Sequence, residues 1–213
     1  MKKFAICFFV WLAFHITTQA QSFNLINQKT LGGSAAETAY SILNSVDSSL
    51  IIGMDSFSGV SSDKSCSNYG ENDAWVCKLN NNNILEWNYC FGGDKTESSV
   101  SILETNSGYV LFMYSNSGIS GNKSLSFPIG NQTNNVNNHI WMVEIDYNGN
   151  ILSQRVYGGE LGVIFKKAIK YNNGYLCLGT IKGEPAYDLS ESTHSSFDYW
   201  LLFLDDNFNK VWD

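Results

Sequence analysis

A motif that recurs along the chain constrains its fold more than any other feature. Residues 73–93 are DAWVCKLNNNNILEWNYCFGG, and residues 139–159 are HIWMVEIDYNGNILSQRVYGG. In both copies a Trp stands 17 residues before the first Gly of a Gly-Gly pair. A third copy, DYWLLFLDDNFNKVWD, occupies residues 198–213. A spacing kept across copies indicates a repeat protein, in which equivalent units fold alike and pack on their neighbours.

The repeat contains four short apolar runs, each with the character of a strand. The run that begins at the Trp alternates apolar and variable residues with a period of two, which is typical of a strand with one better-buried face. An Asn- or Asp-rich turn follows it and predicts a β-hairpin to the next run. The Gly-Gly pair then lets the chain cross to the next unit without a Cβ in the way. The predicted units are residues 32–91, 92–157 and 158–213.

Four short strands in a unit of about 60 residues are typical of a β-propeller blade. A β-sandwich needs no internal repeat, and the coils of a β-solenoid are shorter, so both fit less well. We therefore expect residues 21–213 to form an all-β repeat region of about three four-stranded blades. Closed propellers have about 4–8 blades, so three units predict an incomplete ring. Such a chain is part of a longer protein, a truncated product, or an open stack completed by further blades or a partner chain.

The first 20 residues have the pattern of a secretory signal peptide. Lys2 and Lys3 precede an apolar run at residues 4–14, and Thr18 and Ala20 provide small residues before a cleavage point. The alternative is an uncleaved membrane anchor, but the run is shorter than the span of about 20 apolar residues that a membrane requires. No later segment approaches that length. We expect a secreted or cell-surface protein with no transmembrane segment after cleavage.

The remaining composition excludes some partners. Without residues 1–20 the chain has 11 basic and 20 acidic residues, a charge of about −9, which opposes binding to nucleic acid. Four cysteines remain, and an even number in an exported protein is compatible with disulfides. In the repeat register Cys77, Cys90 and Cys177 occupy apolar strand positions, where they resemble small core residues, and only Cys66 lies in a loop. One disulfide stays open as the alternative. No Cys/His cluster predicts a metal site.

The sequence gives little support to catalysis. His139 and His194 are the only histidines after residue 20, and both lie in or beside loops rather than in a pattern typical of a nucleophile and its base. The acids that recur in register predict turn hydrogen bonds rather than one active centre. They are Glu37 and Glu97, four residues after Gly-Gly, and Asp73 and Asp198, two before Trp. Calcium bound by the Asp/Asn-rich residues 55–73 is a weaker alternative. We expect no enzyme, no cofactor and no metal.

Three segments between the second and third runs differ in length, so they are expected to project as variable loops from a constant scaffold. They are residues 54–72, 114–138 and 180–197. The repeated Trp residues belong to the predicted core, whereas four loop aromatics are better placed to contact a ligand. These candidates are Phe57, Tyr69, Phe127 and Tyr187. The alternative is that loop aromatics only anchor their loops.

Several of these motifs occur together in a known type of protein. They include Gly92-Gly93, Ser101-Ile102-Leu103, Gly108-Tyr109, Asp198-Tyr199-Trp200, residues 145–150 (IDYNGN) and Trp87. Over nearly all of residues 24–213 the chain resembles secreted β-propeller repeat proteins of Bacteroidota, which are often exported by the type IX secretion system. His139, Ser153 and Asn83 depart from the pattern, where Asp, Trp and Gly would stand. The resemblance implies an exported scaffold and supplies no catalytic residues.

The sequence thus predicts an exported, non-enzymatic, β-propeller-like scaffold whose variable loops bind a glycan or a protein at the cell surface. The alternatives are a fragment of a larger secreted enzyme that acts on polysaccharide, and a truncated product without independent function.

Overall fold

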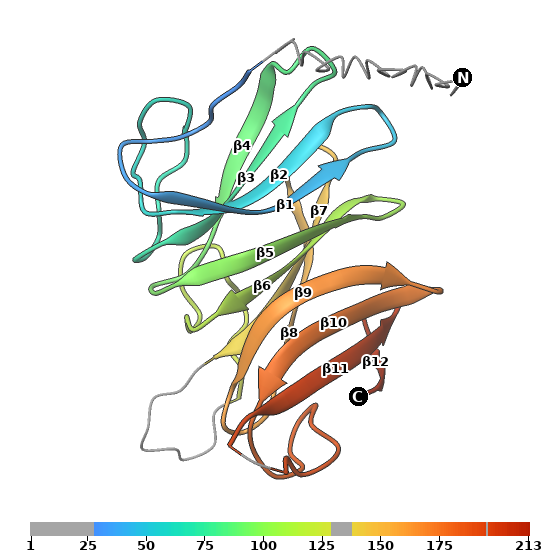
Figure 1. Ribbon diagram of the computed structural model, residues 1–213. Coiled ribbons are helices and arrows are strands. Elements are labelled where there is room, and N and C mark those ends of the chain that lie inside the picture. The colour runs from blue at the N-terminus through green and yellow to red at the C-terminus, as the bar shows by residue number, and fades with distance from the viewer. Residues whose placement is uncertain (1–27, 129–137, 195) are drawn as a thin grey trace, which may run out of the picture. The chain divides into compact units, whose positions relative to one another are not determined.

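The computed structural model describes residues 28–128, 138–194 and 196–213 (Figure 1). The predicted signal peptide lies outside the described residues. Leu31–Asp213 form one compact unit, to which the following description refers.

Twelve strands form three four-stranded antiparallel sheets, each in simple chain order. The first sheet contains β1 (Glu37–Asn44), β2 (Leu50–Ser56), β3 (Asp73–Leu79) and β4 (Leu85–Phe91). The second contains β5 (Glu97–Glu104), β6 (Gly108–Ser115), β7 (His139–Asp146) and β8 (Ile151–Tyr157). The third contains β9 (Val163–Tyr171), β10 (Gly174–Ile181), β11 (Asp198–Asp205) and β12 (Lys210–Trp212). The described residues include no helix, so the predicted all-β class with three four-stranded repeats is confirmed.

The repeat extends to the pairing of the strands. Each third strand begins opposite the last residue of the second strand, as in the pairs Ser56–Asp73, Ser115–His139 and Ile181–Asp198. In every sheet the first strand has extra residues in its pairing with the second strand. The fourth strand of every sheet likewise has one extra residue in its pairing with the third strand. Equivalent residues of the three sheets can therefore be compared position by position.

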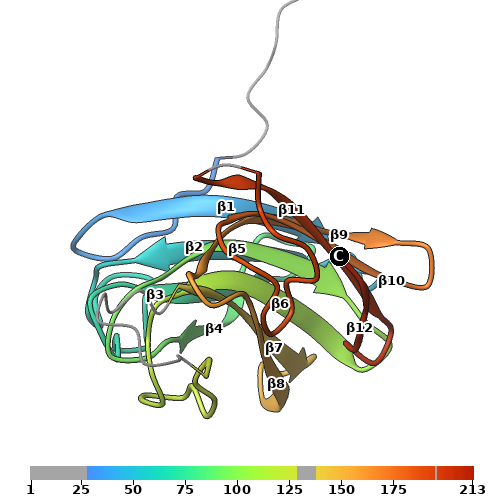
Figure 2. The same ribbon diagram turned by 90° about the horizontal axis from the view of Figure 1, so that it is seen from below.

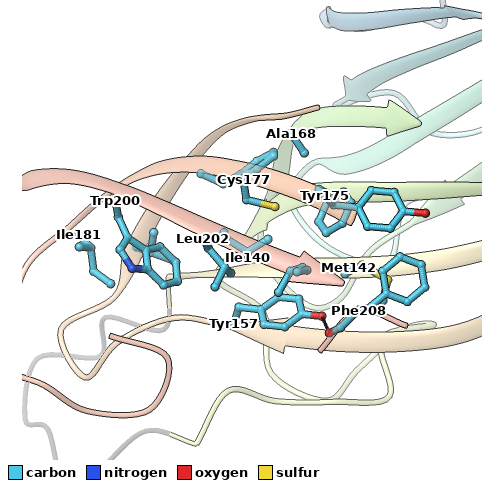
Figure 3. Close-up of a cluster of buried hydrophobic side chains, with 14 of the residues drawn as sticks. Ile140, Met142, Tyr157, Ala168, Tyr175, Cys177, Ile181, Trp200, Leu202 and Phe208 are labelled. Atoms are coloured by element: carbon cyan, nitrogen blue, oxygen red, sulfur yellow. Dashed lines mark hydrogen bonds between the residues drawn. The ribbon is translucent and has the colours of Figure 1, made fainter. Parts of the chain in front are cut away.

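Alternate side chains point to the two sides of each sheet, and both sides of the second sheet pack on a neighbouring sheet. In the second sheet, Trp141 and Val143 pack against Ala74 and Val76 of the first sheet. Ile140 and Met142, which point the other way, pack with the third sheet (Figure 3). The predicted burial of the repeated Trp residues is confirmed, because Trp75, Trp141 and Trp200 are all nearly inaccessible. The core is thus built between sheets.

The sheets follow one another through their first strands. Strand β5 contacts β1, β2 and β3, and β9 contacts β5, β6 and β7. Figure 2 shows β1, β5 and β9 along one side of this arrangement and β4, β8 and β12 along the other. The described sheets do not close into a ring. The described part of the chain also lacks any helix with the length and apolar character needed to cross a membrane.

Candidate binding site

The loops that follow the second strands begin with a repeated segment. Residues 56–65 are SFSGVSSDKS, and residues 115–124 are SNSGISGNKS. The two share Ser, Gly and Lys at matching positions. The prediction that these loops vary throughout is therefore wrong for residues 56–65 and 115–124. The signal was present in the sequence, but the different loop lengths obscured it.

The repeated segment folds as the same tight turn in all three loops. Ser61 and Lys64 exchange two backbone hydrogen bonds of 3.0 and 2.9 Å, and Ser120 and Lys123 do so at 3.2 and 3.0 Å. Ala186 and Leu189 form the equivalent pair at 3.0 and 3.1 Å. The residue after the first partner has positive φ in every case: Ser62 (50°), Gly121 (59°) and Tyr187 (56°). This shared backbone fixes the start of each loop.

An Asp or Asn in the turn holds the first Gly of each Gly-Gly pair. In the second sheet the Gly92 N–H donates to Asn122 Oδ1 at 2.9 Å, and the Asn122 N–H donates to the Gly92 carbonyl at 3.2 Å. Asp63 with Gly32 and Asp188 with Gly158 repeat both bonds. A Cβ on the following Gly93 would lie 2.4 Å from Ser117 Cβ. Gly93, like Gly33 in the first unit, is thus required because the loop packs closely on it.

A second set of bonds ties each loop to the fourth strand through the repeated Trp. Asn88 Oδ1 accepts hydrogen bonds from Trp75 Nε1 at 3.0 Å and from the Ser65 N–H at 2.9 Å. Gln154 has the same role toward Trp141 and Ser124, as does Asp213 toward Trp200 and Ser190. These bonds fix the loops on a rigid base.

The lysines of the repeated segment are interior residues. Lys64 is 1% exposed, and its Nζ donates to the carbonyls of Ser58 and Cys66 and to Asn68 Oδ1, each at 2.8 Å. Lys123 is 2% exposed, bonds to the Leu125 carbonyl, and lies 5.7 Å from the ring centroid of Trp141. Burial lowers the pKa of both amines, that of Lys123 to about 8. Both are engaged within their loops.

The repeated acids form hydrogen bonds inside the fold, as the sequence predicts. Glu97 accepts from Ser115 Oγ at 2.6 Å and from the Gly93 N–H at 2.9 Å, and burial raises its pKa. Glu37 accepts from Ser56 and Ser58 in the same way. Asp73 is fully buried and accepts from the Tyr69 N–H at 2.6 Å.

One histidine begins a strand at the loop end of the sheets, and the other lies in the loop before β11. His139 begins β7 in the register of Asp73, is fully buried, and stacks on Phe127 with 6.0 Å between the ring centroids. His194 has an exposed side chain, and its backbone N–H donates to Asp198.

The four aromatic candidates do not form one cluster. Phe127 is only 6% exposed, and its ring meets that of Tyr187 with centroids 5.1 Å apart. Tyr69 lies against the second loop, since a Cβ on Gly121 would be 2.8 Å from Tyr69 Cβ. Phe127 and Tyr69 therefore connect successive loops. Phe57, Tyr69 and Tyr187 keep 55%, 51% and 50% of their surfaces exposed, so all three remain accessible at the loop end.

A disulfide joins Cys66 of the first loop to Cys90 of β4. The interpretation of Cys90 as a free core residue is wrong, although the residue is buried. Its equivalent in the second sheet is Val156, so the repeat register gave no indication of the bond. Cys77 and Cys177 are free and buried, and burial raises the pKa of both thiols, that of Cys77 to about 12.

A cavity of about 660 Å³ lies at the opposite end of the sheets, among the short turns. Its lining includes Glu104, Glu144, Lys170 and Asp206. Glu104 accepts from Ser45 Oγ at 2.6 Å, Glu144 from Ser107 Oγ at 2.8 Å, and Lys170 pairs with Asp206 at 2.6 Å. Its charged groups are therefore already engaged by neighbours. Among the described residues no group of His, Cys, Asp and Glu is arranged to hold a metal ion.

In comparisons with known proteins, no family model and no curated protein sequence matches this chain. The fold itself defines a class, that of all-β repeat proteins built from four-stranded antiparallel sheets.

Proposed function

We propose that this protein is an exported, β-propeller-like scaffold without catalytic activity, which binds a glycan or a protein at the cell surface through its loop end. The observation that carries the proposal is the set of half-exposed rings of Phe57, Tyr69 and Tyr187 on loops with a repeated, hydrogen-bonded backbone. Aromatic rings offer a large contact surface, and a fixed loop loses little conformational entropy when it binds.

The arrangement of the sheets supports the propeller-like part of the proposal. Each sheet is a four-stranded antiparallel meander, and the first strand of each following sheet packs on the preceding one. In β-propellers, four-stranded sheets repeat around a central channel. The resemblance to secreted Bacteroidota proteins and the signal-peptide pattern support export to the cell surface.

The hydrogen bonds of the repeated acidic residues support a binding role rather than catalysis. Glu37, Glu97 and Asp73 are engaged with Ser hydroxyls and backbone N–H groups of their own loops. The alternative, an enzyme that acts on polysaccharide, is favoured by one observation: Glu104 and Glu144 line the same turn-end cavity. Glycosidases use two carboxylates across one substrate.

A binding screen separates these possibilities. Residues 21–213 are applied to a glycan array and to intact bacterial surfaces, beside a variant with Phe57→Ala, Tyr69→Ala and Tyr187→Ala. We expect binding by the parent and a loss of about tenfold or more in the variant, as for truncated aromatic anchors. Tyr171→Ala, which removes an exposed ring far from the loops, serves as the control.

Equal binding by the triple variant and the parent would refute the loop-end site. Release of reducing sugar by the parent, abolished in Glu104→Gln or Glu144→Gln, would instead establish the enzymatic alternative.

A further inference from the structure

The junction between consecutive sheets has the same arrangement both times it occurs in the structure. In the first junction Ile102 of β5 lies against Gly53 of β2, where an added Cβ would be 2.9 Å from Ile102 Cδ1. In the second junction the Ala168 N–H of β9 donates to Ser101 Oγ of β5 at 3.1 Å. Ile102 and Ala168 are equivalent by strand register. Gly53 and Ser101 likewise belong to equivalent rows of paired residues.

Backbone hydrogen bonds repeat the junction as well. The Glu97 N–H donates to the Asn72 carbonyl, and the Val163 N–H donates to the Asn138 carbonyl, both at 2.9 Å. Each bond joins the first residue of a sheet to the residue that precedes the third strand of the sheet before it. A sheet of this chain therefore docks on the preceding sheet through its first strand, in one repeated way.

The third sheet exposes the side on which a following sheet would dock. The row equivalent to those in the two junctions contains Leu178, Lys167 and Leu201. Leu201 is 44% exposed, whereas its equivalents Val76 and Met142 in the first and second sheets are 0% exposed. Val76 and Met142 are buried because a following sheet packs on them. We call this exposed side of the third sheet the open face.

The first strand of the first sheet exposes the other half of the same junction. Ile42 of β1 is the equivalent of Ile102 and Ala168 by strand register. It is 68% exposed, whereas Ile102 and Ala168 are 4% and 1% exposed because each packs between two sheets. Ala39 is likewise exposed, while its equivalent Phe165 in β9 is buried. Both halves of a twice-used interface are thus uncovered, at opposite ends of the series of three sheets.

The two uncovered halves are chemically compatible. Ile42 on one side meets Leu178 and Leu201 on the other, and the neighbouring Tyr199 of the open face is 87% exposed. Exposed apolar patches of this kind mark interaction surfaces. Lys167 is the charged member of its row, and a lysine can bury its alkyl stem while its amine stays in solvent.

We propose that the first sheet of one copy of this chain docks on the open face of a second copy, with Ile42 over the row of Leu178 and Leu201. Such head-to-tail contacts generate a closed ring when the rotation between copies closes. Two copies of three sheets make a ring of six sheets, within the range of about 4–8 for closed propellers. The inference rests on the propeller-like part of the proposed function and is independent of the loop-end binding site.

A pair of cysteines across the junction tests this contact directly. Residues 21–213 with both Ile42→Cys and Leu178→Cys should form a covalent two-chain product on mild oxidation, visible on a non-reducing gel. Each single variant is the matched control and should stay uncoupled, because a head-to-tail contact places Ile42 on Leu178 and not on its own copy. Absence of the covalent product from the double variant overturns the proposal. Coupling of Leu178→Cys with itself also overturns it, in favour of a contact between like faces.

Sedimentation equilibrium at micromolar concentration measures the assembly without cross-linking. We expect twice the mass of the chain for the parent and for Leu152→Lys, whose residue is 50% exposed on β8, and the mass of one chain for Ile42→Lys. Circular dichroism verifies that each variant retains its β-sheet spectrum. A parent with the mass of one chain, or one that forms open-ended polymers, overturns the ring.

The variant with Phe57→Ala, Tyr69→Ala and Tyr187→Ala separates this inference from the proposed binding site. It should keep the mass of two chains, since its substitutions lie in the loops and not in the junction. Loss of glycan or surface binding in a protein that still assembles concerns the loop end alone, and a monomeric parent that still binds concerns the ring alone.

Discussion

At the level of single residues, the period of two predicts which side chains enter the core. Trp75, Trp141 and Trp200 are buried as this period requires. The hydrogen-bond acceptor of each indole was not predictable, because Asn88, Gln154 and Asp213 are three different residue types with one role. Because Asn, Gln and Asp can all accept this hydrogen bond, the position does not show the same residue type in the three repeats.

Asp73 provides a prediction at this scale. It is fully buried, and its Oδ1 atom has no hydrogen-bond partner. Burial, with a further contribution from the charge of Glu97, raises its pKa from 3.8 to about 6. Between these values the folded state holds a proton that the unfolded state releases. The free energy of unfolding therefore falls as the pH rises from about 4 to about 6, and it stays lower above that range.

Asp73→Asn removes this ionisation while an amide oxygen can still accept from Tyr69. We expect the variant to be more stable than the parent at pH 7.5, by at most about 3 kcal/mol, with little difference near pH 4. Urea unfolding at both pH values measures the effect. Asp198→Asn changes the half-buried residue at the same register position and is the control. A variant less stable than the parent at pH 7.5 would contradict the assignment.

At the level of elements, strands and hairpins follow from the sequence, whereas the loops do not. The turns at Asn80–Asn83 and Asp146–Gly149 close hairpins as their Asn, Asp and Gly residues predict. The loops depend on contacts distant in sequence, such as Gly92 with Asn122 and Cys66 with Cys90. Local patterns cannot specify such pairs.

Two glycines of the second unit differ in whether the structure has space for a side chain. A Cβ at Gly93 would overlap the Ser117 side chain, while a Cβ at Gly118 would meet no atom within 4 Å. We expect Gly93→Ala to destabilise the fold by about 1–3 kcal/mol through overpacking. Gly118→Ala should be neutral or stabilising by about 0.4–1 kcal/mol. Thermal unfolding monitored by circular dichroism compares the two, and equal melting temperatures would refute the close loop contact.

The disulfide between Cys66 and Cys90 provides a further prediction about the first loop. It closes a loop across a sequence separation of 24, and loss of such a cross-link costs about 3 kcal/mol. Cys66→Ala with Cys90→Ala should lower the urea midpoint accordingly. Thiol labelling of denatured residues 21–213 should modify two cysteines before reduction and four after it, since Cys77 and Cys177 are free. Four labelled cysteines without reduction would contradict the bond.

At the scale of the whole molecule, stability is shared between neighbouring sheets. One hydrophobic cluster joins the first and second sheets, and another joins the second and third. Repeat proteins of this kind behave as nearly one-dimensional arrays, in which each unit is stabilised by its neighbours. The repeat and the number of strands per unit were predictable because they leave a period in the sequence. Whether the sheets close into a ring was not predictable from the sequence. Leu201 and Met142 stand in the same apolar pattern, although a neighbouring sheet covers Met142 and none of the described sheets covers Leu201.

Hydrogen exchange should therefore differ among the three sheets. The second sheet is covered on both faces, so we expect its β6 and β7 amides to exchange most slowly, and those of β11 in the third sheet faster. Mass spectrometry of peptic fragments resolves these strands. Exchange in β11 that is as slow as in β7 at every concentration would contradict an open third sheet.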